Sequence, residues 1–243
     1  MSLFNWFKRF AIRTQMLVLS FLFIAFNIVV IAIGDIEYIR LARIISTLAV
    51  SLYFMIVIGH YSKWLYIIYV LQVLSSIGFY YYDFGFGKYL FLAASTLVYI
   101  IIIFWVLRSI QWNQIKHYEY VTFLFIFFTH IGFHFYNVNN FEDMVSTNME
   151  YLLLLLTGIA GMTTCLLVGF SNATRSTFNS AYLMYATFAF VFADFAAMVA
   201  YYYELFPLRF YFIERGSYLF GLYILTRFCY IENNESVTQN YID

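Results

Sequence analysis

Charged residues and prolines are scarce in this sequence. Charged side chains make up 11% of its 243 residues, whereas a soluble globular domain usually carries about 25%. The 13 basic and 13 acidic residues give a formal net charge of zero, so no basic surface for nucleic acid is indicated. The chain has one proline, Pro207, and no glycine- and serine-rich stretch that would serve as a linker. These absences argue against a soluble multi-domain protein and against a nucleic-acid partner.

Residues that bind metals or nucleotides are also few. The two cysteines, Cys165 and Cys229, lie in apolar runs and form no CxxC pair, which is typical of small packing residues. His130 and His134 have the i, i+4 spacing of some metal ligands, but the chain has 4 histidines in all and no HExxH motif. No GxGxxG, P-loop or GxSxG sequence is present. We therefore expect an interfacial or hydrogen-bonded histidine pair, no metal and no cofactor.

Long apolar runs, by contrast, fill most of the chain. Hydrophobic residues make up 64% of it, and aromatic residues, with tyrosines near the ends of the runs, make up 24%. A helix that spans a bilayer needs about 20 apolar residues, and tyrosine is enriched at membrane interfaces. The sequence predicts an all-α polytopic membrane protein, a bundle of eight transmembrane helices. The eight runs are Gln15–Gly34, Arg40–Ile58, Trp64–Tyr81, Tyr89–Leu107, Tyr118–Phe135, Tyr151–Phe170, Ser180–Tyr202 and Tyr211–Tyr230.

Short polar breaks separate these runs and predict one integral membrane domain over residues 1–231. Residues 232–243 are polar and are expected to form a disordered tail. With the N-terminus inside, eight Lys and Arg residues fall on the inner side and five on the outer side, which favours cytoplasmic N- and C-termini. No small-residue cleavage site follows the first run, so we expect a retained first helix in a bacterial inner (plasma) membrane.

A weak internal repeat suggests two halves. The third run ends in "FYYYDF" (Phe79–Phe84), and the seventh contains "FVFADF" (Phe190–Phe195). Each is followed by a segment that carries "YLF", at Tyr89 and at Tyr218. This pattern is typical of two four-helix halves in parallel orientation.

Of the 13 acidic residues, Asp194 alone lies deep within a predicted span, in "FAFVFADFAAMV". An ionised side chain at the bilayer centre costs about 2.5–3.5 kcal/mol, and such residues usually face the bundle interior or a water-filled cavity. Thr187, Asp194 and Tyr201 are spaced by seven and share a face, next to a stripe of alanines that lets another helix approach closely. Desolvation would favour the protonated carboxyl group, which could act as a general acid. The alternative is a structural hydrogen bond to a neighbouring helix.

Asp83 is the second candidate carboxylate, at the end of the third run. Gln72, Ser76 and Asp83 fall at i, i+4 and i+11, which is one face of a helix. Two carboxyl groups in different environments can divide the roles of acid and base. The alternative is that Asp83 is a solvated loop residue at the membrane surface.

These segments resemble the YhhN-like membrane proteins, the lysoplasmalogenase family. The resemblance is carried by "YATFAFVFADFAAMVAYYY", in which Ala193–Asp194 matches the seventh-helix signature, and by "GSYLFGLYILTRF", which places Ser217–Tyr218 in the eighth helix. It implies eight transmembrane helices and hydrolysis of the vinyl ether bond of lysoplasmalogens. The expected partners are thus the membrane and a lysolipid or other single-chain lipid.

The resemblance also implies roles for particular residues. One of Asp194 and Asp83 would deliver a proton to carbon, and the other would orient water, without a metal. Substrate-binding candidates are Arg43, Gln72, Ser76, Thr96, Thr187, Tyr201 and Tyr218. The chain departs from the family pattern at two of its positions, because the early Asp falls on Phe79 and the His falls on Thr96.

Two other functions stay open on the sequence. A non-catalytic scaffold, lipid-binding or sensory protein would share the fold but have lost the early Asp and the His. A transporter would call for discontinuous helices, and the single proline in a loop argues against it. The geometry around Asp83 and Asp194 separates these alternatives, because a shared cavity favours the enzyme. The sequence gives no oligomeric state.

Overall fold

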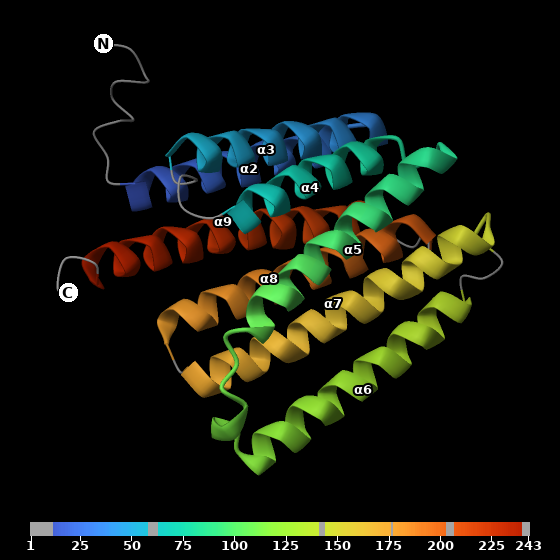
Figure 1. The fold of residues 1–243 in the computed structure, drawn as a ribbon. Helices are drawn as coiled ribbons and strands as arrows, with labels where there is room; N and C mark the ends of the chain where they lie inside the picture. The colour runs from blue at the N-terminus through green and yellow to red at the C-terminus, as the bar shows by residue number, and fades with distance from the viewer. Residues whose placement is uncertain (1–11, 58–62, 141–143, 176, 203–206, 240–243) are drawn as a thin grey trace, which may run out of the picture.

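A computed structural model describes residues 12–57, 63–140, 144–175, 177–202 and 207–239 and shows an all-helical chain (Figure 1). These described residues form eight long helices and one short 3-10 turn. The helices are α2 (Ile12–Ile33), α3 (Ile36–Val57), α4 (Lys63–Tyr80), α5 (Gly85–Leu107), α6 (His117–Asn140), α7 (Asn148–Arg175), α8 (Phe178–Tyr202) and α9 (Pro207–Gln239), with η1 (Trp112–Gln114) between α5 and α6.

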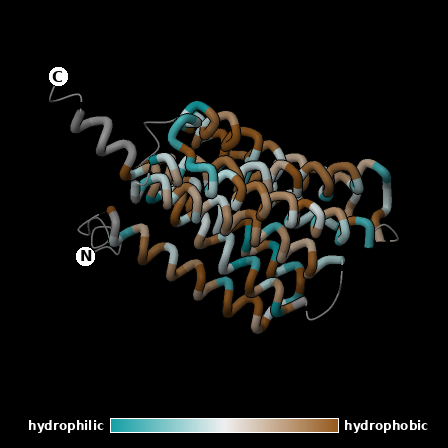
Figure 2. Tube along the Cα trace, turned by 90° about the horizontal axis from the view of Figure 1, so that it is seen from below, coloured by the Kyte–Doolittle hydropathy of each residue, from teal (hydrophilic) through white to brown (hydrophobic). Residues whose placement is uncertain are grey.

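Seven of these helices, α2 to α8, are long and apolar enough to cross a membrane. A helix satisfies its own backbone hydrogen bonds, which is the condition for a segment in hydrocarbon. Large apolar side chains such as Phe21 and Leu22 on α2 point outward and are 68% and 61% exposed. Figure 2 shows apolar residues along the helices and hydrophilic residues at several of the turns. The chain is an integral membrane protein built as a helical bundle.

The eighth expected span, Tyr211–Tyr230, lies in α9, which is not among the seven. This helix carries Glu214, Arg215 and Arg227 within that stretch, and these charges lower its hydropathy. Eight spans therefore remain a prediction. The structure also continues α9 to Gln239, whereas the sequence predicts a disordered tail from residue 232. Adding residues to an existing helix is far easier than nucleating one, so a polar segment can continue it.

Helix α9 lies between the first helices and α8 (Figure 1), and it packs against α8, α2 and α3. Consecutive helices pair from α2 to α5 and again from α6 to α9. In addition, α5 packs extensively against α7, whereas α9 packs more against α2 than against α3. The two four-helix halves that the repeat suggests stay a prediction. Helix α6 lies at the edge of the bundle and packs chiefly against α7.

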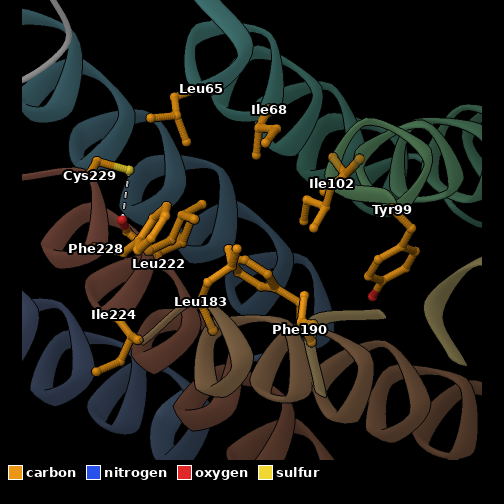
Figure 3. Packing of buried hydrophobic residues seen from close by; sticks show 14 of the residues in the cluster. Leu65, Ile68, Tyr99, Ile102, Leu183, Phe190, Leu222, Ile224, Phe228 and Cys229 are labelled. Atoms are coloured by element: carbon orange, nitrogen blue, oxygen red, sulfur yellow. Dashed lines mark hydrogen bonds between the residues drawn. The ribbon is translucent and has the colours of Figure 1, made fainter. Parts of the chain in front are cut away.

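The core is largest where α8 and α9 meet. Figure 3 shows Leu183 and Phe190 of α8 beside Leu222 and Phe228 of α9, with Tyr99 of α5 at one edge. The expected alanine stripe is buried along α8, with Ala186, Ala193, Ala197 and Ala200 all less than 5% exposed. A Cβ on Gly221 of α9 would come within 2.9 Å of the Phe190 ring. Small residues on both helices therefore allow the close approach that holds Asp194 inside the bundle.

Candidate functional site

Asp194 faces a cavity inside the bundle, as expected for a carboxyl group within a span. The hydroxyl of Tyr99, on α5, donates a hydrogen bond of 2.6 Å to Asp194 Oδ2 on α8. Tyr99 is buried, whereas Asp194 keeps partial accessibility because it lines the cavity. The tyrosine thus fixes the orientation of the carboxyl group and occupies one of its two oxygens.

The cavity has a volume of about 60 Å³. One water molecule needs roughly 10–15 Å³ measured in this way, so there is room for several. Among its lining residues, Asp194 is the only carboxylate and His134 the only imidazole, joined by Tyr99 and Thr157. Tyr82 adds a further phenol ring, and the rest of the wall is apolar or glycine, with Phe79, Phe91, Leu92, Leu154, Gly158, Gly161, Met162, Val191, Phe195, Ala197 and Met198. The result is a small, mainly apolar cavity with a few polar groups in its wall.

His134 reaches the cavity from α6 because α7 leaves space for its ring. A Cβ on Gly158 would come within 1.9 Å of His134 Nε2, so no larger residue fits there without displacing the imidazole. His134 Nε2 lies 3.2 Å from the carbonyl oxygen of Leu154, which can accept a hydrogen bond from it. The sequence predicts an interfacial or hydrogen-bonded pair, and His134 is indeed hydrogen-bonded. Its place in the lining of the Asp194 cavity was not predicted, although the i, i+4 spacing of His130 and His134 was the available signal.

Thr96 contributes to the site only through a neighbour. Its hydroxyl lies 2.7 Å from the hydroxyl of Thr157, which lines the cavity, and it also donates to the carbonyl of Leu92. The two other residues of the expected Asp194 face do not line the cavity. Thr187 is buried and donates to the carbonyl of Leu183 in its own helix, and Tyr201 packs against the ring of Tyr82 at 4.3 Å.

Asp83 does not share this cavity, and its predicted position on the face of Gln72 and Ser76 is wrong. Helix α4 ends at Tyr80, and Asp83 lies in the turn that leads to α5. The turn is tight, because a Cβ on Gly87 would come within 1.9 Å of the carbonyl oxygen of Tyr81. The side chain of Asp83 is 58% exposed. This matches the alternative of a surface residue.

A guanidinium group holds Asp83 in place at the surface. Arg40 donates from Nη1 to Oδ2 at 2.6 Å and from Nη2 to Oδ1 at 3.2 Å, which is a bidentate pair. This hydrogen bonding holds the pKa of Asp83 below its ordinary value. Asp83 is therefore ionised and paired at neutral pH, which does not suit a group that must donate a proton there.

Gln72, Ser76 and Tyr218 come together in the bundle, away from the cavity lining. The hydroxyl of Tyr218 donates to Gln72 Oε1 at 2.9 Å, and Ser76 donates to Thr47 Oγ1 at 3.1 Å. The Ser76 and Tyr218 hydroxyl oxygens lie 3.5 Å apart. All four side chains are buried. They join α3, α4 and α9 by hydrogen bonds.

Arg43 lies next to this network and is buried with a carboxylate that the sequence did not single out. Its Nη1 atom is 3.0 Å from Glu214 Oε1, and Arg215 Nη2 is 2.5 Å from Glu214 Oε2. The Arg43 guanidinium also lies 4.6 Å from the centre of the Phe79 ring and 4.7 Å from that of Tyr218. Phe79 thus separates the arginine from the Asp194 cavity, whose wall it forms.

A second buried carboxylate occupies the same end of the bundle. Glu150, at the start of α7, lies 3.1 Å from Lys88 Nζ and accepts a 2.5 Å hydrogen bond from the hydroxyl of Tyr202. That hydroxyl lies 3.1 Å from the hydroxyl of Tyr82. Since α3, α5, α7 and α9 begin at this end and α4 and α8 finish there, it carries most of the buried charge.

Comparisons with known proteins return no match among family models, curated proteins or solved structures. The fold and the cavity define a helical membrane protein with a carboxyl group that faces a small cavity inside the bundle, and the resemblance to YhhN-like proteins stays a prediction.

Proposed function

We propose that this protein is a membrane hydrolase similar to lysoplasmalogenases, which cleaves the vinyl ether bond of a lysoplasmalogen-type lysolipid. The observation that carries the proposal is the Asp194 carboxyl group, oriented by Tyr99 and facing a cavity with room for water inside an apolar bundle. Intramembrane ionisable residues commonly mark functional sites. A lipid substrate can reach such a cavity from the bilayer without crossing water.

The chemistry requires one acid and one water molecule. Protonated Asp194 gives its proton to the vinyl carbon farther from the ether oxygen, which leaves an oxocarbenium ion at the other carbon. Water adds there and returns a proton to the carboxylate, and the resulting hemiacetal collapses to a fatty aldehyde and a glycerophospho-alcohol. Because Tyr99 donates to Oδ2, Oδ1 is the oxygen assigned to carry the proton. His134 and Thr157 line the same cavity and are suited to orienting the water.

The position of Asp83 gives it no step in this scheme. Its pair with Arg40 lies at the surface end of the bundle, so its part is to anchor the turn before α5. The acid and base roles then fall to one carboxyl group in succession, with the ionised form stabilised by the Tyr99 hydroxyl.

In this proposal α9 is the eighth span of a protein of the bacterial inner membrane. Both termini then lie on the cytoplasmic side. Two observations support it, since α9 packs among α2, α3 and α8, and its charges at Glu214 and Arg215 are buried against Arg43 rather than facing outward. An even number of spans puts the two ends on one side, where the basic residues favour the cytoplasm.

A second candidate is a non-catalytic lipid-binding or sensory protein. It is favoured by the exposure of Asp83 and by Phe79 at the position of the early family Asp.

The hydrolase and the non-catalytic protein differ in whether they turn over lysoplasmalogen. Purified protein in lipid nanodiscs is incubated with lysoplasmalogen, and aldehyde release is measured beside Asp194→Asn and Asp83→Asn variants. The hydrolase predicts release that Asp194→Asn abolishes and Asp83→Asn largely keeps. A folded wild type that releases no aldehyde favours the non-catalytic protein.

A further inference from the structure

A second and larger cavity opens beside the Asp194 cavity, between α6 and α8 with α7 as its floor. We refer to it as the α6–α8 groove. Its volume of about 530 Å³ lies within the range of roughly 300–1,000 Å³ that ligand pockets usually have. Its lining residues are Phe123, Ile126, Phe127, His130, Phe133, Met162, Cys165, Leu166, Phe188, Val191, Phe192 and Phe195.

The groove is open on its outer side and adjoins the Asp194 cavity on its inner side. Phe133 and Phe192, one from each wall, are both 53% exposed, so the mouth faces the surface that hydrocarbon surrounds. Met162, Val191 and Phe195 line both the groove and the Asp194 cavity. These three side chains therefore stand where the groove and the Asp194 cavity adjoin.

We infer that the α6–α8 groove holds the hydrocarbon chain of a single-chain lipid whose head end lies toward Asp194. The inference rests on the proposed function for the role of Asp194, but the binding itself does not require catalysis. Apart from His130, the lining is apolar or weakly polar, which fits an alkyl chain and disfavours a charged headgroup. A linear chain also fits the position of the groove next to the Asp194 cavity, with which it shares three lining side chains.

The order of residues along α8 gives the orientation. Phe188, Val191 and Phe192 line the groove before Asp194, and Phe195 lines it just after. The helix ends at Tyr202, which bonds to Glu150 of the Lys88–Glu150 ion pair. A chain in the groove therefore extends toward the middle of the membrane. The lipid linkage lies at Asp194, and the headgroup lies toward the charged end of the bundle.

A helix from a second copy does not fit the groove as well as a chain does. A helix measures about 10–12 Å across with its side chains, so it would lie over the mouth rather than enter the groove. A diacyl phospholipid can place one chain near the mouth, but its second chain and its headgroup keep it in the bilayer. Competition between one-chain and two-chain lipids therefore tests the inference.

The experiment is photo-crosslinking in diacylphosphatidylcholine nanodiscs with a lysophosphatidylcholine that carries a diazirine at the end of its acyl chain. This probe has an ester in place of the vinyl ether, so it reports binding without turnover. We expect saturable labelling of peptides that contain residues 123–133, 162–166 and 188–195, suppressed by unlabelled lysophosphatidylcholine and not by extra diacyl lipid. Labelling spread over outward-facing residues such as Phe21 and Leu22, with no competition, would overturn the inference.

A pair of variants on α7 tests the groove itself. Cys165→Phe adds bulk inside it and should remove most of the saturable labelling. Leu156→Phe adds a similar group on the same helix at an outward-facing position that is 43% exposed and should leave labelling unchanged. Equal labelling of both variants would contradict the assignment. If Cys165→Phe fails to fold, the competition experiment on the wild type still tests whether the groove binds the probe.

The results also separate this inference from the proposed function. Saturable groove labelling without aldehyde release from lysoplasmalogen would contradict the proposed hydrolase activity and support the lipid site. Aldehyde release without saturable groove labelling would support the hydrolase activity and contradict the groove as the site of the lipid chain.

Discussion

The hydroxyl of Tyr99 and the carboxyl group of Asp194 lie 2.6 Å apart and join α5 to α8 inside the bundle. The contact explains how a carboxyl group is held in a fixed orientation among apolar helices. A hydrogen bond to a charged group contributes about 1.5–3 kcal/mol. It therefore stabilises the carboxylate that forms when Asp194 gives up its proton.

Replacing Tyr99 with phenylalanine should slow the hydrolase by more than about tenfold, because each 1.36 kcal/mol lost from the transition state is a factor of ten. Aldehyde release from lysoplasmalogen is the measurement. Tyr69→Phe is the matched control, since Tyr69 is also buried and bonds to Thr226 within the main core. If the two variants lose activity equally, the Tyr99 contact has no special part in the reaction.

Gly158→Ala should displace His134, because a Cβ there would come within 1.9 Å of the imidazole. Overpacking of this kind usually costs about 1–3 kcal/mol of stability. We expect slower aldehyde release, similar to that of His134→Ala, together with a lower unfolding free energy. Gly132→Ala on α6 is the control, since nothing lies within 4 Å of its added Cβ. Wild-type activity in Gly158→Ala would show that the reaction does not depend on the position of the His134 ring.

Glu214→Gln should be the most destabilising of the carboxyl substitutions. The change leaves Arg43 and Arg215 buried side by side without the charge between them, and breaking a buried ion pair costs about 3–5 kcal/mol. Equilibrium unfolding in mild detergent measures the loss. A cost below that of the exposed Asp83→Asn variant would contradict the view that Glu214 neutralises this cluster.

The Arg40–Asp83 pair should stabilise the fold only slightly and only above acidic pH. Because Arg40 holds the pKa of Asp83 below its ordinary value of 3.8, the stabilisation is present above that pH and disappears as the pH falls through the lower, folded-state pKa. Exposed pairs contribute about 0.2–1 kcal/mol. Asp83→Asn should therefore unfold slightly more easily than the wild type at pH 7 and equally at the lowest pH that the detergent sample tolerates. A difference that grows on acidification would contradict this assignment.

Local sequence patterns predicted the features that depend on one helix alone. Apolar runs predicted the seven helices that are long and apolar enough to span a membrane, and the alanine stripe with its single carboxylate predicted the inward face of α8. Periodicity failed at Asp83, because the chain leaves the helix at Tyr80, three residues before it. The i, i+11 relationship assumes a helix that continues through both positions.

The same sequence patterns could not predict contacts between helices that are far apart in the chain. The pairing of Arg43 with Glu214 joins α3 to α9, and the approach of His134 to the Asp194 cavity depends on a glycine in α7. Periodicity shows which face a residue occupies but not which helix meets that face. Glu214 between Ile213 and Arg215 in "FIERGS" was the available signal, since adjacent opposite charges at the end of an apolar run are costly unless they are paired.

The most direct test of the central claim is to follow the proton that Asp194 is proposed to deliver. Wild type and Asp194→Asn are incubated with lysoplasmalogen in D₂O, and the aldehyde is trapped at once and weighed by mass spectrometry. The account predicts an aldehyde of full chain length from the wild type with one deuterium next to the carbonyl, and none from Asp194→Asn. An aldehyde without deuterium, or equal yields from the two proteins, would contradict it.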